Sequence, residues 1–110
     1  FKMTLAVLIH ETHETIEQIH IDIEPSKNEV FKILSGRATF IGQWPDIDVV
    51  IMKAESSGII KNVNILPKPF EDEEVYGKIL LMRMDENSDP QDFTVDEYLL
   101  LFPRDESILA

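Results

Sequence analysis

The stretch Met3-Thr4-Leu5-Ala6-Val7-Leu8-Ile9 decides the fold of this chain. It is a short, almost wholly apolar run that contains β-branched residues and ends at a polar cluster. A run of this length without polar alternation is typical of a β-strand that is covered on both faces. We therefore predict a strand over Met3 to Ile9 at the centre of a sheet.

The neighbouring segments predict further strands. After the polar turn from His10 to Thr15, the isoleucines Ile19, Ile21 and Ile23 alternate with polar residues, which is the period of a half-buried strand and completes a hairpin. Further strands are predicted over Ala38–Ile41, Ile47–Met52, Ile59–Ile65 and Val75–Met84, the last interrupted by Gly77.

Two helices are predicted from their capping signals. Ser26 and Glu29 have the spacing of a capping box, and the apolar stripe that follows stops at Gly36. Thr94 and Glu97 repeat that spacing, with Phe93 and Tyr98 placed as a hydrophobic staple. Leu99, Leu101 and Phe102 continue this second helix until Pro103 ends it.

These elements predict one α+β domain over residues 1–110. Its sheet is mixed or mainly antiparallel, has about five to six strands and is packed by two helices, in the order ββαβββ(β)α. A β-grasp-like arrangement is the alternative, because such domains also begin with a hairpin followed by a helix.

The charge balance limits the classes of partner. Asp and Glu number 21 against 10 Lys and Arg, so the formal net charge is −11. Such a surface repels phosphate backbones and anionic membranes, which makes nucleic acid and membrane poor partners and leaves a basic protein as the expected one. The chain contains no Cys and no apolar run long enough for a signal segment, so a cytoplasmic or nuclear location is expected. The oligomeric state stays open.

Two patterns suggest metal ligands. His10, His13 and His20 lie in or near the first hairpin and offer imidazole nitrogens. Asp85-Glu86-Asn87-Ser88-Asp89 matches the first liganding positions of a calcium-binding loop, but Pro90 stands where that loop needs Gly. For the second pattern we favour an ordinary turn capped by its own side chains.

An acidic run supplies the candidate partner-binding site. Four consecutive carboxylates follow an aromatic residue that comes after two prolines, and the predicted site is Phe70, Glu71, Asp72, Glu73 and Glu74. We expect Trp44 to close the edge of the core. No phosphate loop, nucleophile elbow or Cys nucleophile occurs in the sequence, so no catalytic residue and no cofactor are predicted.

Several segments, read in order, resemble a known family. They are Ala38-Thr39-Phe40-Ile41-Gly42-Gln43-Trp44, Leu66-Pro67-Lys68-Pro69-Phe70, Val75-Tyr76-Gly77-Lys78-Ile79-Leu80-Leu81 and Asp92-Phe93-Thr94-Val95-Asp96-Glu97-Tyr98. From about Val30 to Phe102 the chain resembles a family of small acidic proteins of unknown function in microalgae, diatoms among them, and in large DNA viruses of algae. The resemblance implies no activity and no functional residue.

The functional prediction is a non-catalytic interaction or regulatory module that binds a basic protein partner. The alternative is a small metal-dependent enzyme or metal-binding protein that uses His10, His13 and His20. Enzymatic activity is left open by the sequence, and the non-catalytic role is favoured.

Overall fold

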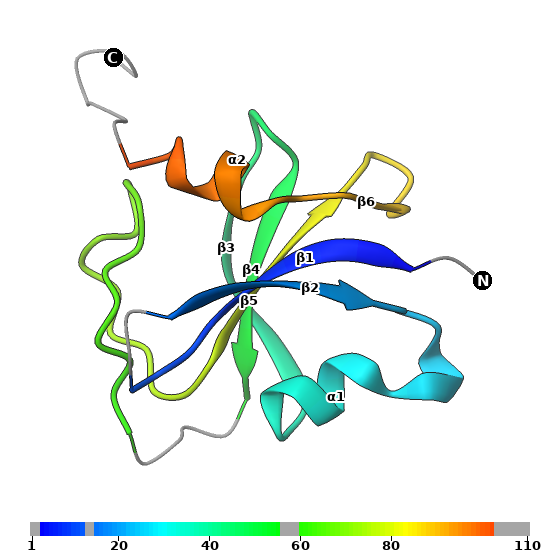
Figure 1. Ribbon diagram of the computed structural model, residues 1–110, viewed down its shortest axis with the longest axis horizontal. Coiled ribbons are helices and arrows are strands. Elements are labelled where there is room, and N and C mark those ends of the chain that lie inside the picture. Colours follow the sequence, from blue (N-terminus) through cyan, green and yellow to red (C-terminus); the bar gives the residue numbers. More distant parts are fainter. Residues whose placement is uncertain (1–2, 13–14, 56–59, 103–110) are drawn as a thin grey trace.

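The computed structural model describes residues 3–12, 15–55 and 60–102 (Figure 1). In chain order the elements are β1 (Thr4–Ile9), β2 (Ile16–Ile21), the 3-10 turn η1 (Pro25–Lys27), α1 (Glu29–Leu34), β3 (Ala38–Trp44), β4 (Val49–Ala54), β5 (Ile79–Met84), β6 (Pro90–Gln91) and α2 (Val95–Leu99).

The strands form one sheet in the order β2-β1-β5-β4-β3, and β6 pairs with the end of β5. The predicted α+β class and element order are confirmed, and β1 is an inner strand between β2 and β5, while β5 lies at the centre. Every pairing between described strands is antiparallel, including the one that joins β1 to β5. Across residues 3–12, 15–55 and 60–102 the sheet is therefore antiparallel throughout, without the parallel pairing that a β-grasp-like arrangement would need.

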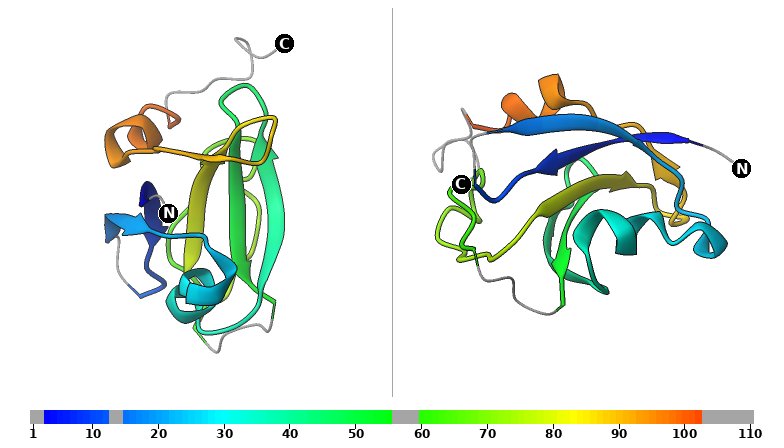
Figure 2. Two further views of the ribbon diagram at one scale, coloured as in Figure 1. Left: turned by 90° about the vertical axis from the view of Figure 1, so that its right-hand side faces the viewer. Right: turned by 60° about the horizontal axis from the view of Figure 1, so that its bottom comes forward.

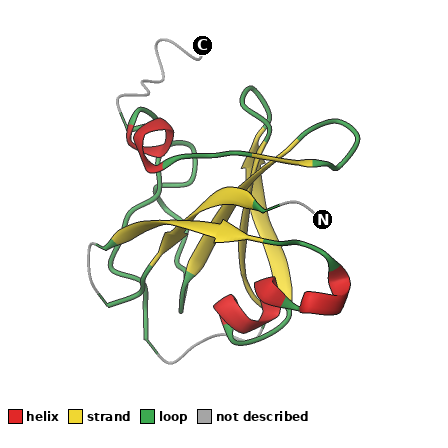
Figure 3. Ribbon diagram, turned by 45° about the vertical axis from the view of Figure 1, so that its right-hand side comes forward, coloured by secondary structure: helices red, strands yellow, loops and turns green. Residues whose placement is uncertain are grey.

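Both faces of the sheet are covered, which explains the apolar run in β1. Alternate side chains of β1 enter separate clusters: Val7 and Ile9 on one face, Ala6 and Leu8 on the other. The first face is covered by α2 and by the long connection between β4 and β5, and the second by α1 (Figures 2 and 3).

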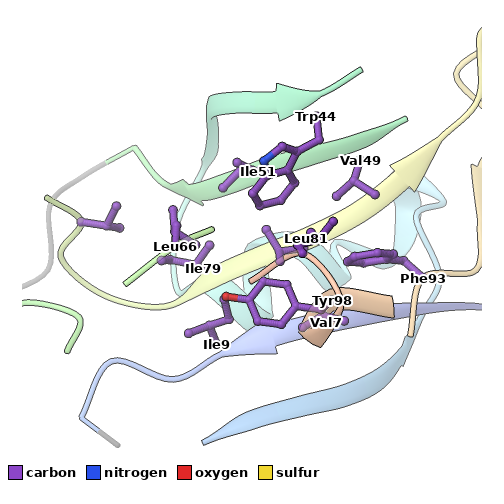
Figure 4. Close-up of a cluster of buried hydrophobic side chains, with 12 residues drawn as sticks. Val7, Ile9, Trp44, Val49, Ile51, Leu66, Ile79, Leu81, Phe93 and Tyr98 are labelled. Carbon is purple, nitrogen blue, oxygen red and sulfur yellow. The ribbon is translucent and has the colours of Figure 1, made fainter. Parts of the chain in front are cut away.

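The larger cluster gathers the aromatic side chains (Figure 4). Trp44, Phe93 and Tyr98 are almost fully buried there, against Ile79 and Leu81 of β5. The indole Nε1 of Trp44 donates a hydrogen bond to the carbonyl of Lys68 at 2.9 Å. Trp44 thus closes the edge of the core, as predicted.

The prediction for α1 is wrong at its start. The helix begins at Glu29, after the separate turn η1, and its N-cap is Asn28 in the left-handed conformation without a side-chain cap. Glu29 does not complete a box with Ser26, because its Oε1 accepts from the backbone N–H of Asp22 at 2.9 Å. The Glu29 carboxylate, which the sequence pattern predicts to cap the helix, instead accepts a hydrogen bond from the backbone of Asp22.

The box that begins α2 is confirmed, but the helix is shorter than predicted. Thr94 Oγ1 accepts from Glu97 N, and the Glu97 carboxylate accepts from Thr94 N. The helix ends at Leu99, and its buried side is formed by Tyr98, with Leu101 buried just beyond it. Leu99 is 48% exposed and lies outside the core.

Two predicted strands differ from the structure. Within 60–65 the chain makes only an isolated bridge between Lys61 and Tyr76, and Ile59 lies outside the described residues. The last long strand begins at Ile79 rather than Val75, because Gly77 has a φ of 92°, which breaks extended pairing. Residues 60–78 are consequently a connection that crosses the first face of the sheet.

Candidate functional site

The acidic run lies in a groove on the connection between β4 and β5. The groove has a volume of about 490 Å³. Its lining consists of two short segments, which are Lys61, Asn62, Val63, Asn64 and Ile65 on one side and Glu71, Asp72, Glu73 and Glu74 on the other. The acidic side is predicted by the sequence, whereas the side from Lys61 to Ile65 is not.

The first side of the groove is fixed by two asparagines. Asn62 is buried, and its Nδ2 donates to the carbonyl of Gly77 at 2.9 Å while its Oδ1 accepts from Asn64 N. Asn64 Nδ2 donates to the carbonyl of His10 at 2.9 Å. With these two side chains turned inward, the intervening Val63 and the following Ile65 are left 57% and 67% exposed.

The second side of the groove begins in a turn. The backbone N–H of Glu73 donates to the carbonyl of Phe70, which starts the acidic run at the end of a compact loop. Asp72, Glu73 and Glu74 are exposed and Glu71 is half-buried. Oε2 of Glu71 is shielded from solvent and meets no hydrogen-bond donor among the described residues.

Lys61 is the cation of this groove, and Glu74 holds it. The Lys61 Nζ to Glu74 Oε1 distance is 2.9 Å, and the hydrogen bond and charge of Glu74 raise the pKa of the Lys61 ammonium. Both side chains are exposed, so this pair adds little to stability. Because Lys61 is paired with Glu74, it does not neutralise Asp72 or Glu73, and neither of these carboxylates forms an ion pair within the described part of the chain.

Phe70 belongs to the core edge, unlike the acids that follow it. It is half-buried, its ring makes a T-shaped contact with Trp44 at 5.5 Å between centroids, and it lies over Gly42. It does not line the groove. Of the five residues of the predicted site, the groove lining thus contains the four acids and not Phe70.

The structure does not bring the histidines together. His10 follows β1 next to the Ile9–Ile16 pair, whereas His20 is opposite Leu5, so the hairpin register separates them by about 16 Å. His10 Nε2 is 2.8 Å from Glu17 Oε2, and His13 lies outside the described residues. Among the residues that the structure describes, no group of three or more His, Cys, Asp or Glu side chains is placed to hold a metal ion.

The loop that resembles a calcium site is a capped turn. Asp85 Oδ1 accepts from the backbone N–H groups of Asn87 and Asp89, and its Oδ2 accepts from Gln91 Nε2 at 3.0 Å. Its carboxylate is therefore used inside the turn, as the alternative interpretation predicted. In the described part of the chain neither helix has the length or the apolar composition to cross a membrane.

The fold and groove define a small antiparallel α+β domain with an acidic surface groove that has an apolar side. The lining carries no imidazole and no hydroxyl or thiol group, so it offers amides, carboxylates and one amine for binding. The chain belongs to a family of unknown function (DUF5880), whose model matches residues 7–101. No curated protein and no solved structure matches the chain.

Proposed function

We propose that the protein is a non-catalytic interaction module of the cytoplasm or nucleus. Its ligand is a basic segment of a partner protein that also carries apolar side chains. The observation that supports this most directly is the placement of exposed Val63 and Ile65 in the same groove as Glu71–Glu74. Protein interfaces commonly combine an apolar centre with a polar rim in this way.

The charge of the groove supports a basic ligand. Its lining has four carboxylates and one ammonium group, and that ammonium is paired with Glu74. The whole chain has a formal net charge of −11, which attracts a cationic segment before contact. Electrostatic attraction of this kind raises the association rate and is weakened by salt.

Glu71 supplies the most specific contact point. A carboxylate oxygen that is shielded from water is costly unless a donor reaches it. Its Oε2 has no donor within the described residues, and it lies in the wall of the groove. A guanidinium or ammonium group of the ligand would satisfy this oxygen, and Arg would do so with a forked pair of donors.

A peptide-binding measurement tests the proposal. The probe is a fluorescent peptide in which Arg and Leu alternate, and its comparison peptide has Glu in place of Arg. We expect anisotropy to report binding of the Arg peptide alone. Replacing Asp72, Glu73 and Glu74 together by Lys should weaken that binding by about tenfold or more, because each exposed charge contact is worth up to about 1 kcal/mol.

The matched control changes the same charge elsewhere. Glu24, Glu86 and Asp89 are exposed acids outside the groove, and their joint replacement by Lys gives the same net charge. Equal loss of binding in both triple variants would show that net charge, not the groove, attracts the peptide. Replacing Val63 and Ile65 by Ser tests the apolar side, and unchanged binding in that variant would exclude it from the contact.

A further inference from the structure

Strand β3 is an unprotected edge of the sheet. It is the outermost strand beside β4 (Figure 2). Edge strands usually carry charged residues or Pro, which discourage pairing with other chains. The opposite edge strand, β2, has Glu17, but β3 has no charged residue from Ala38 to Trp44. Its one interruption is a bulge between Phe40 and Gly42.

The backbone of β3 has groups available for pairing. Glu55 N donates to the Arg37 carbonyl, so Arg37 and Glu55 form a hydrogen-bonded pair. Such pairs alternate with non-hydrogen-bonded pairs along an antiparallel ladder. Ala38 and Phe40 therefore fall at positions whose N–H and C=O point away from β4, toward the open side, where the described residues place no other strand.

Apolar surface continues from this edge onto the adjacent face. Phe40 is 69% exposed and lies between two hollows of about 360 Å³ and 270 Å³. Both hollows also contain Val50, and the smaller one includes Met52, Met82 and Met84. Neither lining contains a charged side chain, so a strand that pairs with β3 would also bury apolar surface around Phe40.

We propose that the occupant of this edge is a second copy of the chain, paired antiparallel through β3. Arg37 precedes the strand and Asp46 follows it, so a two-fold axis brings these opposite charges near each other at both ends of the pairing. Arg37 also lies 3.9 Å from Glu55 of its own chain, but both of those side chains are exposed, so that ion pair is weak. Each chain has a net charge of −11, but β3 itself carries no charged residue. Two copies can therefore pair through β3 without bringing the carboxylates of one strand against those of the other. A basic partner would find no acidic residue along it.

The expected dimer is weak and has an unusual response to salt. The bulge at Ile41 divides the edge into two short segments, which limits the number of backbone hydrogen bonds across the axis. The two net charges of −11 repel at long range, and this repulsion outweighs the exposed Arg37–Asp46 contacts, which are each worth little. Salt therefore removes more repulsion than attraction and leaves the apolar contact intact. Dimerisation therefore strengthens as salt increases, whereas binding of a basic peptide to the acidic groove weakens.

Sedimentation of the full chain tests this inference. We expect the average mass to rise toward that of a dimer between about 10 μM and about 1 mM protein, and to rise further between about 0.05 M and 0.5 M NaCl. Phe40→Lys places a charge on the edge and should raise the dimer dissociation constant by about tenfold or more. Phe31→Lys is the matched control, because Phe31 is 50% exposed on α1 and should leave the dimer intact.

A second variant removes a backbone donor. Ala38→Pro deletes an N–H that points to the open side, so the fold should persist, as circular dichroism would show, while the dimer is lost. At 0.5 M NaCl the Debye length is below about 8 Å, so long-range repulsion is largely screened. A protein that stays monomeric at all concentrations under this condition would overturn the proposal. So would a dimer that survives both variants, or one that salt dissociates. Peptide binding by Phe40→Lys should equal that of the wild type, which separates this test from that of the groove.

Discussion

Single residues explain how the connection between β4 and β5 is held against the sheet. Gly42 lies on β3 beneath the ring of Phe70, and a Cβ atom there would lie 2.6 Å from Phe70 Cε1. The same ring contacts Trp44, whose indole donates to the loop carbonyl of Lys68. The loop that carries the acidic groove is thus anchored by an aromatic ring that needs a glycine beneath it.

Gly42→Ala should therefore destabilise the protein. The rigid ring of Phe70 has to move and loses its contact with Trp44, which costs about 1–3 kcal/mol, as other overpacked sites do. Urea unfolding of the single variants and of Gly42→Ala/Phe70→Leu would measure this, and the double variant should recover part of the loss. Gly36→Ala is the control, since its nearest contact is Ala54 Cβ at 3.6 Å. Equal costs at both glycines would contradict the explanation.

Glu97 should make stability depend on acid pH. Arg83 Nη2 lies 2.7 Å from Glu97 Oε2, and this hydrogen bond lowers the pKa of Glu97 below its ordinary value of 4.5. A lowered pKa in the folded state stabilises the protein above the ordinary value, and that stabilisation disappears as pH falls through the lowered one. Because Glu97 is 40% exposed, solvent screening limits the effect to about 1 kcal/mol or less.

Glu97→Gln measures this contribution. The difference in free energy of unfolding between wild type and variant should be largest near pH 7 and should shrink toward about pH 3. Asp96→Asn is the control, because it removes a charge from the same helical turn without touching Arg83. A difference that is constant across this pH range would show that the Arg83 pair is not responsible.

Among the elements, the two helices differ in how they begin. α2 has its own capping box and a buried staple of Phe93 and Tyr98. α1 begins at a left-handed Asn28 after a 3-10 turn, and Glu29 is tied to the backbone of Asp22. The start of α2 is encoded by neighbouring residues, whereas the start of α1 depends on its attachment to the chain that follows β2.

Paired substitutions at the two predicted caps should separate these cases. Thr94→Ala should cost about 1 kcal/mol, because Glu97 N loses its acceptor. Ser26→Ala should change stability by less than about 0.5 kcal/mol, since Ser26 is exposed and caps no helix. Thermal unfolding checks both values. A cost at Ser26 as large as that at Thr94 would show that the first box forms after all.

At the scale of the whole molecule, charge opposes compactness. The formal net charge of −11 is spread over a chain whose Cα radius of gyration is 13.5 Å. Like charges confined to that volume repel one another, and unfolding relieves the repulsion. The acidic groove concentrates part of this charge at Glu71–Glu74. This concentration favours binding of a cationic ligand, but the mutual repulsion of the carboxylates lowers the stability of the fold.

Added salt should therefore raise the melting temperature. At low protein concentration, NaCl raised from about 0.01 M to 0.15 M shortens the Debye length from about 30 Å to 8 Å. If the relieved repulsion is about 1 kcal/mol, the melting temperature rises by about 4–8 °C. The variant with Asp72, Glu73 and Glu74 replaced by Lys gains two charge units at each site, which brings −11 to −5, and should respond less. A wild-type melting temperature that falls with salt would contradict this.

The sequence by itself determined the features that neighbouring residues encode. The uninterrupted apolar run of β1, the alternation in β2 and the box from Thr94 to Glu97 each predicted the observed element, because burial period and capping are local properties. The acidic side of the groove was also visible, as a run of consecutive carboxylates at Glu71–Glu74.

The tertiary structure alone decided the other side of the groove. Asn62 and Asn64 turn inward because they reach carbonyls of Gly77 and His10, which are distant in sequence, and these bonds leave Val63 and Ile65 exposed. Contact with Trp44 likewise holds Phe70 at the core edge, outside the lining of the groove, and the hairpin register separates His10 from His20. These outcomes depend on which distant groups meet after the chain folds, and no local pattern contains that information.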